Sequence, residues 1–144
     1  MGDQKLTLDR LSELRLYDPP VDLLVLSACH RCGDEQSELG FAGLAVQAGV
    51  KTALASLWYV SDEGTLTLMT EFYHILKQAP IKAEALRQAQ IAMIKNQARI
   101  ENGNLILENS NQTIPLPPEL ANQHHPNLQH PYYWAAFTMI GSPW

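Results

Sequence analysis

"VDLLVLSA", residues 21–28, is the stretch of this sequence that decides the fold. It is a nearly continuous apolar run, and the turn-forming residues Asp18, Pro19 and Pro20 come directly before it. Strands that are covered on both faces of a parallel sheet have this composition, whereas half-exposed strands alternate apolar and polar residues. The stretch therefore predicts a buried strand in an α/β protein.

The residues after this strand predict a helix and a second strand. "LGFAGLAVQAG", residues 39–49, is rich in small apolar residues, and Gly49 is placed as a helix C-terminal stop. "KTALASLWYV", residues 51–60, is another apolar run, while "GDEQSE" before the helix reads as a loop. A strand, a helix and a strand in this order predict a right-handed crossover and two parallel strands.

The rest of the chain predicts two more helices, a hairpin and a last strand. Ser61 is placed to cap one helix, and a second is expected over residues 82–99. Two short apolar runs within residues 103–117 predict a small β-hairpin insertion, and residues 132–141 predict the last core strand. The apolar face expected for the Ser61-capped helix consists of Leu66, Met69, Tyr73 and Leu76. Three core strands make a thin sheet, so strands are expected to be missing from one edge.

Composition excludes several classes of function. The 144 residues suffice for one domain, and a net charge of −5 without any run of Lys or Arg argues against a nucleic-acid partner. No apolar stretch approaches the ~18 residues of a membrane span, and residues 1–15 do not resemble a secretory signal. Two cysteines are too few for a disulfide scaffold. A soluble cytoplasmic protein without a membrane partner is therefore expected.

Both cysteines lie in "SACHRCGDE", residues 27–35. Cys29 follows the first predicted strand at its carboxyl end, where open α/β sheets place their sites, so it is a candidate nucleophile or else a buried apolar side chain. The spacing of Cys29 and Cys32 leaves a dithiol reaction as an alternative. A zinc site would need a second ligand pair, and the adjacent His124 and His125 would point to opposite sides of an extended chain. No metal or cofactor is predicted.

A nucleophilic cysteine needs a base, and the spacing of the histidines identifies none. His30 is adjacent to Cys29, and adjacent residues that leave a strand face opposite ways. His74 is expected on a helix, and His130 precedes Pro131 in a proline-rich loop. The sequence thus offers a nucleophile without an obvious partner.

Six segments, in this order, resemble the carboxyl-terminal half of a CHAT domain, a caspase-like family often attached to tetratricopeptide repeats. They are "LTLDRLSEL", "VDLLVLSAC", "GFAGLAVQAGVKTALASLWYVSDE", "LMTEFYHIL", "KAEALRQAQIAMI" and "HPYYWAAFTMIGSPW". The resemblance implies that residues 1–144 form one partial domain. Its implied fold is a caspase-like three-layer α/β sandwich, with a mostly parallel sheet, helices on both faces and the amino-terminal strands missing.

The same resemblance implies a cysteine endopeptidase similar to caspases and separases. Cys29 would be the nucleophile and, through its backbone N–H, an oxyanion donor, which leaves Cys32 incidental. The implied substrate-binding residues are Ser56, Leu57, Trp58 and Asp62. The carboxylate of Asp62 would pair with a basic substrate side chain, although the position favours a role in capping or charging a helix N-terminus.

In the family, the catalytic histidine and a second oxyanion donor lie on a strand that precedes the cysteine strand, and here that strand would lie before Met1. The resemblance therefore implies that an upstream half of the domain supplies them and that the chain alone is inactive. Its expected partners are a protein or peptide substrate, tetratricopeptide repeats, the upstream half, or a second copy paired through an exposed sheet edge. The alternative is an inactive caspase-like scaffold for protein–protein interaction or oligomerisation.

Overall fold

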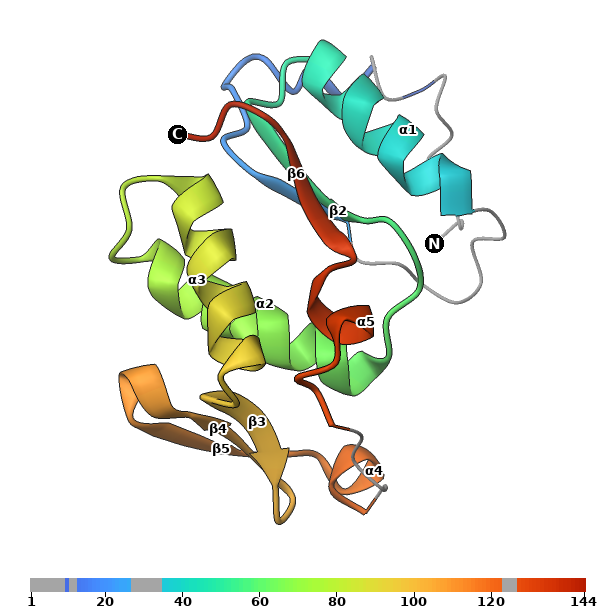
Figure 1. The fold of residues 1–144 in the computed structure, drawn as a ribbon. Coiled ribbons are helices and arrows are strands. Elements are labelled where there is room, and N and C mark those ends of the chain that lie inside the picture. Colours follow the sequence, from blue (N-terminus) through green and yellow to red (C-terminus); the bar gives the residue numbers. More distant parts are fainter. Residues whose placement is uncertain (1–9, 11–12, 27–34, 123–126) are drawn as a thin grey trace. The chain divides into compact units, whose positions relative to one another are not determined.

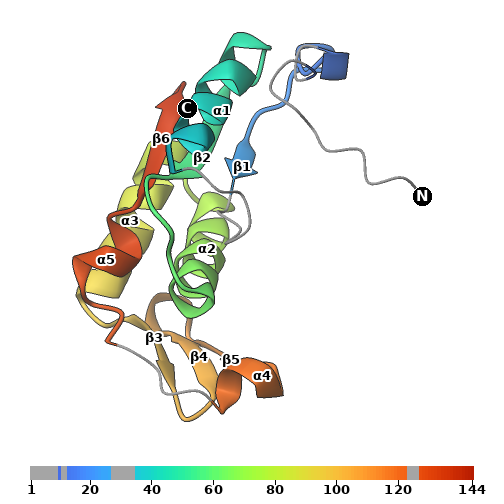
Figure 2. The same cartoon turned by 90° about the vertical axis from the view of Figure 1, so that its right-hand side faces the viewer.

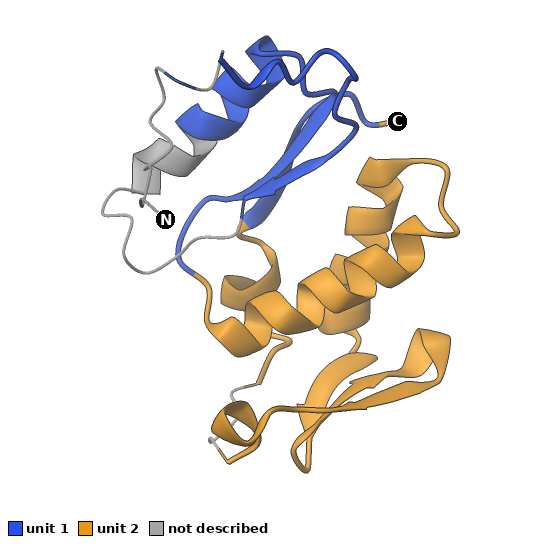
Figure 3. Cartoon of the chain, turned by 180° about the vertical axis from the view of Figure 1, so that it is seen from behind, with its two compact units in different colours: residues 1–59, 137–143 blue, residues 60–136, 144 orange. Residues whose placement is uncertain are grey.

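The computed structural model describes residue 10 and residues 13–26, 35–122 and 127–144, with the side chains of 35–39 left out. Its elements fall into two units, which are described separately below (Figure 3). Unit 1 comprises residues 1–59 and 137–143, and unit 2 comprises residues 60–136 and 144. Within the described ranges, no helix combines the length and the apolar character needed to cross a membrane.

Unit 1 is built on a three-stranded sheet in the order β1-β2-β6 (Figure 1). The strands are β1 (Leu24–Leu26), β2 (Thr52–Ser56) and β6 (Phe137–Gly141). The β1 and β2 strands are parallel, as the strand–helix–strand pattern predicted. The β6 strand is antiparallel to β2, so the described sheet is mixed and not mostly parallel. An apolar run does not encode strand direction, which is why the sequence did not reveal this reversal.

The two parallel strands differ in how deeply they are buried. All five residues of β2 are buried, whereas the three of β1 are only half-buried. The β1 strand is at the edge of the described sheet, since no described strand pairs with its other side. The prediction of a strand covered on both faces is therefore wrong for β1 and right for β2, because both edge and central strands can have apolar runs.

Helix α1 (Glu35–Gln47) packs on the sheet of unit 1 (Figures 1 and 2). The fully buried Ala42 of α1 contacts a cluster with Ala53 and Ala55 of β2, and these small side chains let the helix approach the sheet closely. The helix begins at Glu35, inside the polar stretch that the sequence predicted as a loop. Acidic residues are favourable in a first helical turn, so polarity alone did not mark the boundary.

The end of α1 is set by Gly49, as the sequence predicted. Gly49 has a φ of 110°, a conformation that glycine adopts without a steric penalty. Its N–H donates to the carbonyl of Val46 at 3.1 Å, and the N–H of Val50 donates to the carbonyl of Ala45 at 3.1 Å. These two bonds satisfy carbonyls that would otherwise be unpaired at the end of the helix.

In its described residues, unit 2 contains two packed helices, a second sheet and three short helical segments; α2 and α3 lie side by side in Figure 1. Its elements are α2 (Asp62–Leu76), α3 (Lys82–Ile94), β3 (Ala98–Glu101), β4 (Asn104–Leu107), η2 (Glu108–Ser110), β5 (Gln112–Pro115), α4 (Pro118–Ala121) and α5 (Pro131–Trp134). The strands form an antiparallel sheet in the order β3-β4-β5. Residues 103–117 thus contain the β4–β5 hairpin, to which β3 adds a strand.

Two further boundaries differ from the sequence prediction. The helix expected over residues 82–99 ends at Ile94, because Asn96 adopts a positive φ of 59° and the chain then enters β3. The strand expected over residues 132–141 begins only at Phe137. Its first half forms α5, since Pro131 suits the first turn of a helix and the Nδ1 of His130 caps that turn.

The buried face of α2 is not the face that the sequence predicted. The residues buried on α2 are Glu63, Gly64, Thr67, Leu68, Glu71 and Phe72. Tyr73, from the predicted face, is 45% exposed. The buried stripe has helical spacing but includes polar side chains, which hid it from an analysis of apolar periodicity. Two of its polar members make hydrogen bonds: the Thr67 hydroxyl donates to the Glu63 carbonyl at 2.7 Å, and Oε1 of Glu71 accepts from Asn109 at 3.0 Å.

Candidate functional site

The candidate active site lies at the carboxyl ends of β1 and β2, the edge at which two parallel strands leave the sheet. The register pairs Leu26, the last residue of β1, with Ala55 of β2. Along the sequence, Cys29 comes three residues after Leu26, and Trp58 comes three residues after Ala55. Cys29 itself, with His30 and Cys32, lies outside the described residues.

Three of the four predicted substrate-binding residues lie where β2 ends. Ser56 is the last residue of β2, is paired with Phe137 of β6, and is only 2% exposed. Leu57 is 40% exposed and Trp58 is half-buried. Leu57 and Trp58 therefore have surface that a ligand could contact, whereas Ser56 belongs to the buried strand end.

Asp62, the fourth predicted residue, is the first residue of α2 and belongs to unit 2. Its side chain is exposed, and the capping bond at this helix terminus is made by Ser61, whose Oγ accepts from the Gly64 N–H at 3.3 Å. The carboxylate of Asp62 lies where the helix dipole favours negative charge, so its position has a structural reason without any ligand.

Two of the histidines considered as bases are described, and both belong to unit 2. His130 precedes α5, and its Nδ1 accepts from the Tyr132 N–H at 3.2 Å. A neutral ring in this bond carries its proton on Nε2, which leaves no lone pair for a thiol proton. His74 lies in the last turn of α2 and lines a groove of unit 2. His124 and His125 lie outside the described residues.

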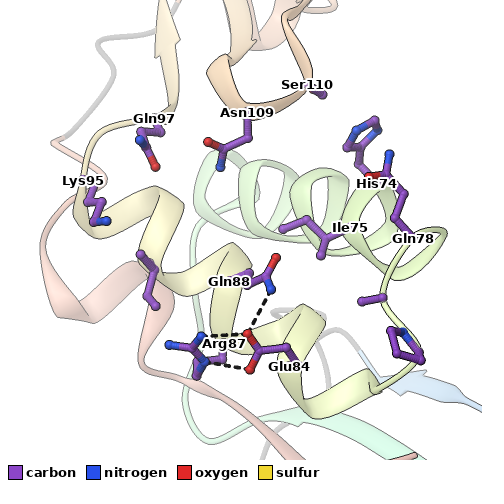
Figure 4. A pocket seen from close by; sticks show the side chains of 13 residues that line it. His74, Ile75, Gln78, Glu84, Arg87, Gln88, Lys95, Gln97, Asn109 and Ser110 are labelled. Carbon is purple, nitrogen blue, oxygen red and sulfur yellow. Dashed lines mark hydrogen bonds and ion pairs between the residues drawn. The ribbon is translucent and has the colours of Figure 1, made fainter.

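This groove of unit 2, called the α2–α3 groove below, was missed by the sequence analysis (Figure 4). Its volume is about 1060 Å³. Its lining includes His74 of α2, Gln78 just after α2, Glu84, Arg87, Gln88 and Lys95 on or beside α3, Gln97, and Asn109 of η2. They come from elements far apart in the sequence, so no spacing signal joins them. The one sequence signal for the groove is the spacing of Glu84, Arg87 and Gln88, since residues three and four apart lie on the same face of a helix.

Glu84 is the centre of a hydrogen-bonded cluster in the groove (Figure 4). Arg87 donates to it through Nε at 2.8 Å and through Nη2 at 2.7 Å, and Gln88 Nε2 donates at 2.9 Å. The Arg87 guanidinium is the main cause, and the Gln88 amide the second, of a Glu84 pKa that falls from 4.5 to about 2. The same bonds raise the pKa of Arg87. The two side chains therefore stay ionised and mutually neutralised at ordinary pH.

Arg87→Ala is expected to raise the Glu84 pKa from about 2 towards 4.5, because the main hydrogen-bond donor is removed. In the native chain the depressed pKa favours folding at pH above 4.5, and this contribution is lost as the pH falls towards 2. Titration of the Glu84 carboxyl carbon by NMR measures the shift. Lys77→Ala, which removes an exposed cation outside the groove lining, should leave that titration unchanged; an equal response to both substitutions would contradict the assignment.

Comparison with known proteins gives the family of the chain. A model of the CHAT domain family matches residues 1–142. Searches of curated proteins and of solved structures found no match. The match covers nearly the whole chain, including β1, β2, Cys29 and both units. Membership of this family suggests a caspase-like protease superfamily. On this evidence, the chain belongs to the CHAT domain family.

Proposed function

We propose that the chain carries the nucleophile of a caspase-like cysteine endopeptidase. The Cys29 thiolate attacks the carbonyl carbon of a peptide bond, the leaving amine takes a proton, and a thioester remains on Cys29. Water then attacks the thioester, which frees the carboxylate product and restores the thiol. The Cys29 backbone N–H is one donor to the oxyanion of each tetrahedral intermediate.

The observation that carries this proposal is the parallel register of β1 and β2 in a chain of the CHAT family. The pairing of Leu26 with Ala55 means that the segments leading to Cys29 and to Trp58 leave the sheet at one edge. A nucleophile after one strand and substrate contacts after its neighbour are the arrangement that such an edge allows. We further propose that the complete domain is a caspase-like three-layer sandwich.

The proposed base comes from outside the 144 residues. No histidine precedes Cys29 in this sequence, whereas the family places its histidine on the strand before the cysteine strand. We propose that an upstream half of the domain supplies this histidine and a second oxyanion donor, and that it extends the sheet at the β1 edge. A second copy is the other proposed partner for that edge, and tetratricopeptide repeats are a proposed partner elsewhere in the full protein.

The proposed substrate contacts are Leu57, Trp58 and Asp62, with Ser56 supporting the strand end. Leu57 and Trp58 would pack on the substrate chain, and the exposed carboxylate of Asp62 would bind a basic side chain. Peptides with Lys or Arg before the cleaved bond are therefore the preferred substrates in this proposal.

The test is labelling with a peptide that has a basic last residue and an electrophilic acyloxymethyl ketone. In the longest natural protein that contains these residues, we expect stoichiometric labelling at Cys29, located by peptide mass spectrometry. Cys29→Ala should abolish labelling because no thiolate remains, and Asp62→Asn should slow it for the basic peptide but not for its alanine analogue. The isolated 144 residues should react as slowly as an ordinary thiol of pKa ~8.5.

Cys32→Ser is the matched control, since it removes the other thiol while leaving the proposed nucleophile. Unchanged labelling of this variant would exclude the dithiol reaction, whereas its loss would favour that reaction over proteolysis. A protein that is not labelled at Cys29, and whose biological function survives Cys29→Ser, would be the inactive scaffold instead.

A further inference from the structure

The α2–α3 groove is lined by four carboxamide side chains that come from separate parts of unit 2 (Figure 4). They are Gln78, Gln88, Gln97 and Asn109. A carboxamide has the same donor and acceptor groups as a peptide unit, so it can bond to a polypeptide main chain on either side. A helix already satisfies its own main-chain groups, and only an extended segment would offer them to such a groove.

Two of these carboxamides are held in a defined orientation. Gln88 donates through Nε2 to Glu84 at 2.9 Å, and Asn109 donates through Nδ2 to Oε1 of Glu71 at 3.0 Å. A carboxylate only accepts hydrogen bonds, so in both cases the amide nitrogen must face it and the amide oxygen is left for other donors. Figure 4 shows the Gln88 oxygen pointing away from Glu84. The groove therefore presents two oriented acceptors to the N–H groups of a ligand.

Glu71, which orients Asn109, is a residue whose burial disfavours folding. It is fully buried on α2, and among the described residues its Oε2 has no hydrogen-bond partner. Burying a carboxylate with an unpaired oxygen is unfavourable, and an apolar residue would pack there at a lower cost. Its Oε1 accepts the hydrogen bond that fixes Asn109 at the groove. Positioning that amide gives a reason for a carboxylate in this place.

The charges of the groove point to an acidic group on the ligand. Glu84 and Arg87 neutralise each other, as described above. Lys95, just after α3, has no carboxylate partner within the described part of the chain. It is therefore the uncompensated charge of this groove, in a chain whose net charge is −5.

The size of the groove suits a polypeptide segment. Its volume of about 1060 Å³ lies just above the ~300–1,000 Å³ that small-molecule sites occupy. We propose that the α2–α3 groove binds an extended segment of a partner protein through the segment's main chain, with an acidic side chain against Lys95. This site differs in residues from the proposed catalytic edge and does not depend on protease activity.

The probe is a phage-displayed library of random 12-residue peptides, selected against the chain carrying Cys29→Ala so that no peptide can be cleaved. We expect enriched peptides to share an acidic position, and Lys95→Glu to weaken their binding at least tenfold in fluorescence anisotropy. A selection repeated on the Lys95→Glu protein should yield a basic residue at that position. N-methylation of one contacting peptide bond should cost about tenfold, the effect of a lost hydrogen bond.

Glu71→Gln tests the orientation of Asn109, because a glutamine at this position can turn its own amide nitrogen towards Asn109 and reverse the asparagine. We expect it to weaken peptide binding severalfold while circular dichroism stays that of the parent. Lys77→Glu, a charge reversal outside the groove lining, is the matched control and should leave the affinity unchanged. The proposal is overturned if no peptide is enriched, if Lys77→Glu and Lys95→Glu act alike, or if N-methylated peptides bind equally well.

Discussion

Replacing Phe72 with alanine is expected to lower the free energy of unfolding by about 3–5 kcal/mol. The Phe72 ring is fully buried on the inner stripe of α2, and among the described side chains it is the largest with no exposed surface. Truncation removes the transfer free energy of the ring and leaves a cavity that the surrounding helices fill only partly. Urea denaturation followed by circular dichroism measures the loss, which is a large share of a domain's ~5–15 kcal/mol of stability.

Tyr73→Ala is the matched control for this prediction. Tyr73 is the next residue of the same helix, carries a ring of similar size and is 45% exposed. Its ring centre lies 5.4 Å from that of Phe72, so some aromatic contact is lost, at a cost of about 0.5–1.5 kcal/mol. Equal costs for the two substitutions would contradict the observed face of α2 and favour the face expected from apolar periodicity.

Gly141→Ala is the second substitution for which we expect a large loss of stability. Gly141 ends β6 with a φ of 99°, and an alanine Cβ there would lie 2.4 Å from the carbonyl oxygen of Lys51. The backbone conformation alone costs a non-glycine residue about 1–3 kcal/mol. The clash is with the backbone, so the Lys51 carbonyl must also shift, and that carbonyl accepts from the Ser142 N–H at 2.8 Å. Thermal unfolding should show a lower midpoint.

Gly40→Ala, at another glycine of unit 1, is expected to raise the stability slightly. Gly40 lies inside α1, and a Cβ built on it meets nothing within 4 Å. Alanine in a helix interior is favoured over glycine by about 0.5–1 kcal/mol, so this variant should be slightly more stable. A Gly141→Ala protein as stable as Gly40→Ala would mean that β6 does not meet Lys51 as described.

Local patterns predicted the elements better than they predicted the packing. The runs around β1 and β2, the Gly49 stop and the Ser61 cap depend on neighbouring residues, so they could be read directly. The buried face of α2 could not, because Glu71 and Thr67 are accepted there only through bonds to other groups. The hydrogen-bond partner that makes a buried carboxylate tolerable is Asn109, which no local pattern connects with it.

At the candidate active site, too, local sequence identified individual residues, whereas their arrangement depends on distant contacts. Cys29 was identified from its place after an apolar run and from the resemblance to the CHAT family, which the family match confirms as the family of the chain. The role of Cys29 stays a prediction, as do those of Ser56, Leu57, Trp58 and Asp62. The register of Leu26 with Ala55, which brings the ends of the two strands to one edge, depends on hydrogen bonds between segments separated by a whole helix.

By itself, the sequence determined the family, the α/β class and the approximate places of the main helices and strands. Periodicity, caps and turn residues act over a few positions, and these are sufficient for such features. The tertiary structure alone decided the antiparallel direction of β6, the inner face of α2 and the assembly of the α2–α3 groove. Each of these depends on contacts between segments far apart along the chain, whose hydrogen bonds and packing exist only once the chain has folded.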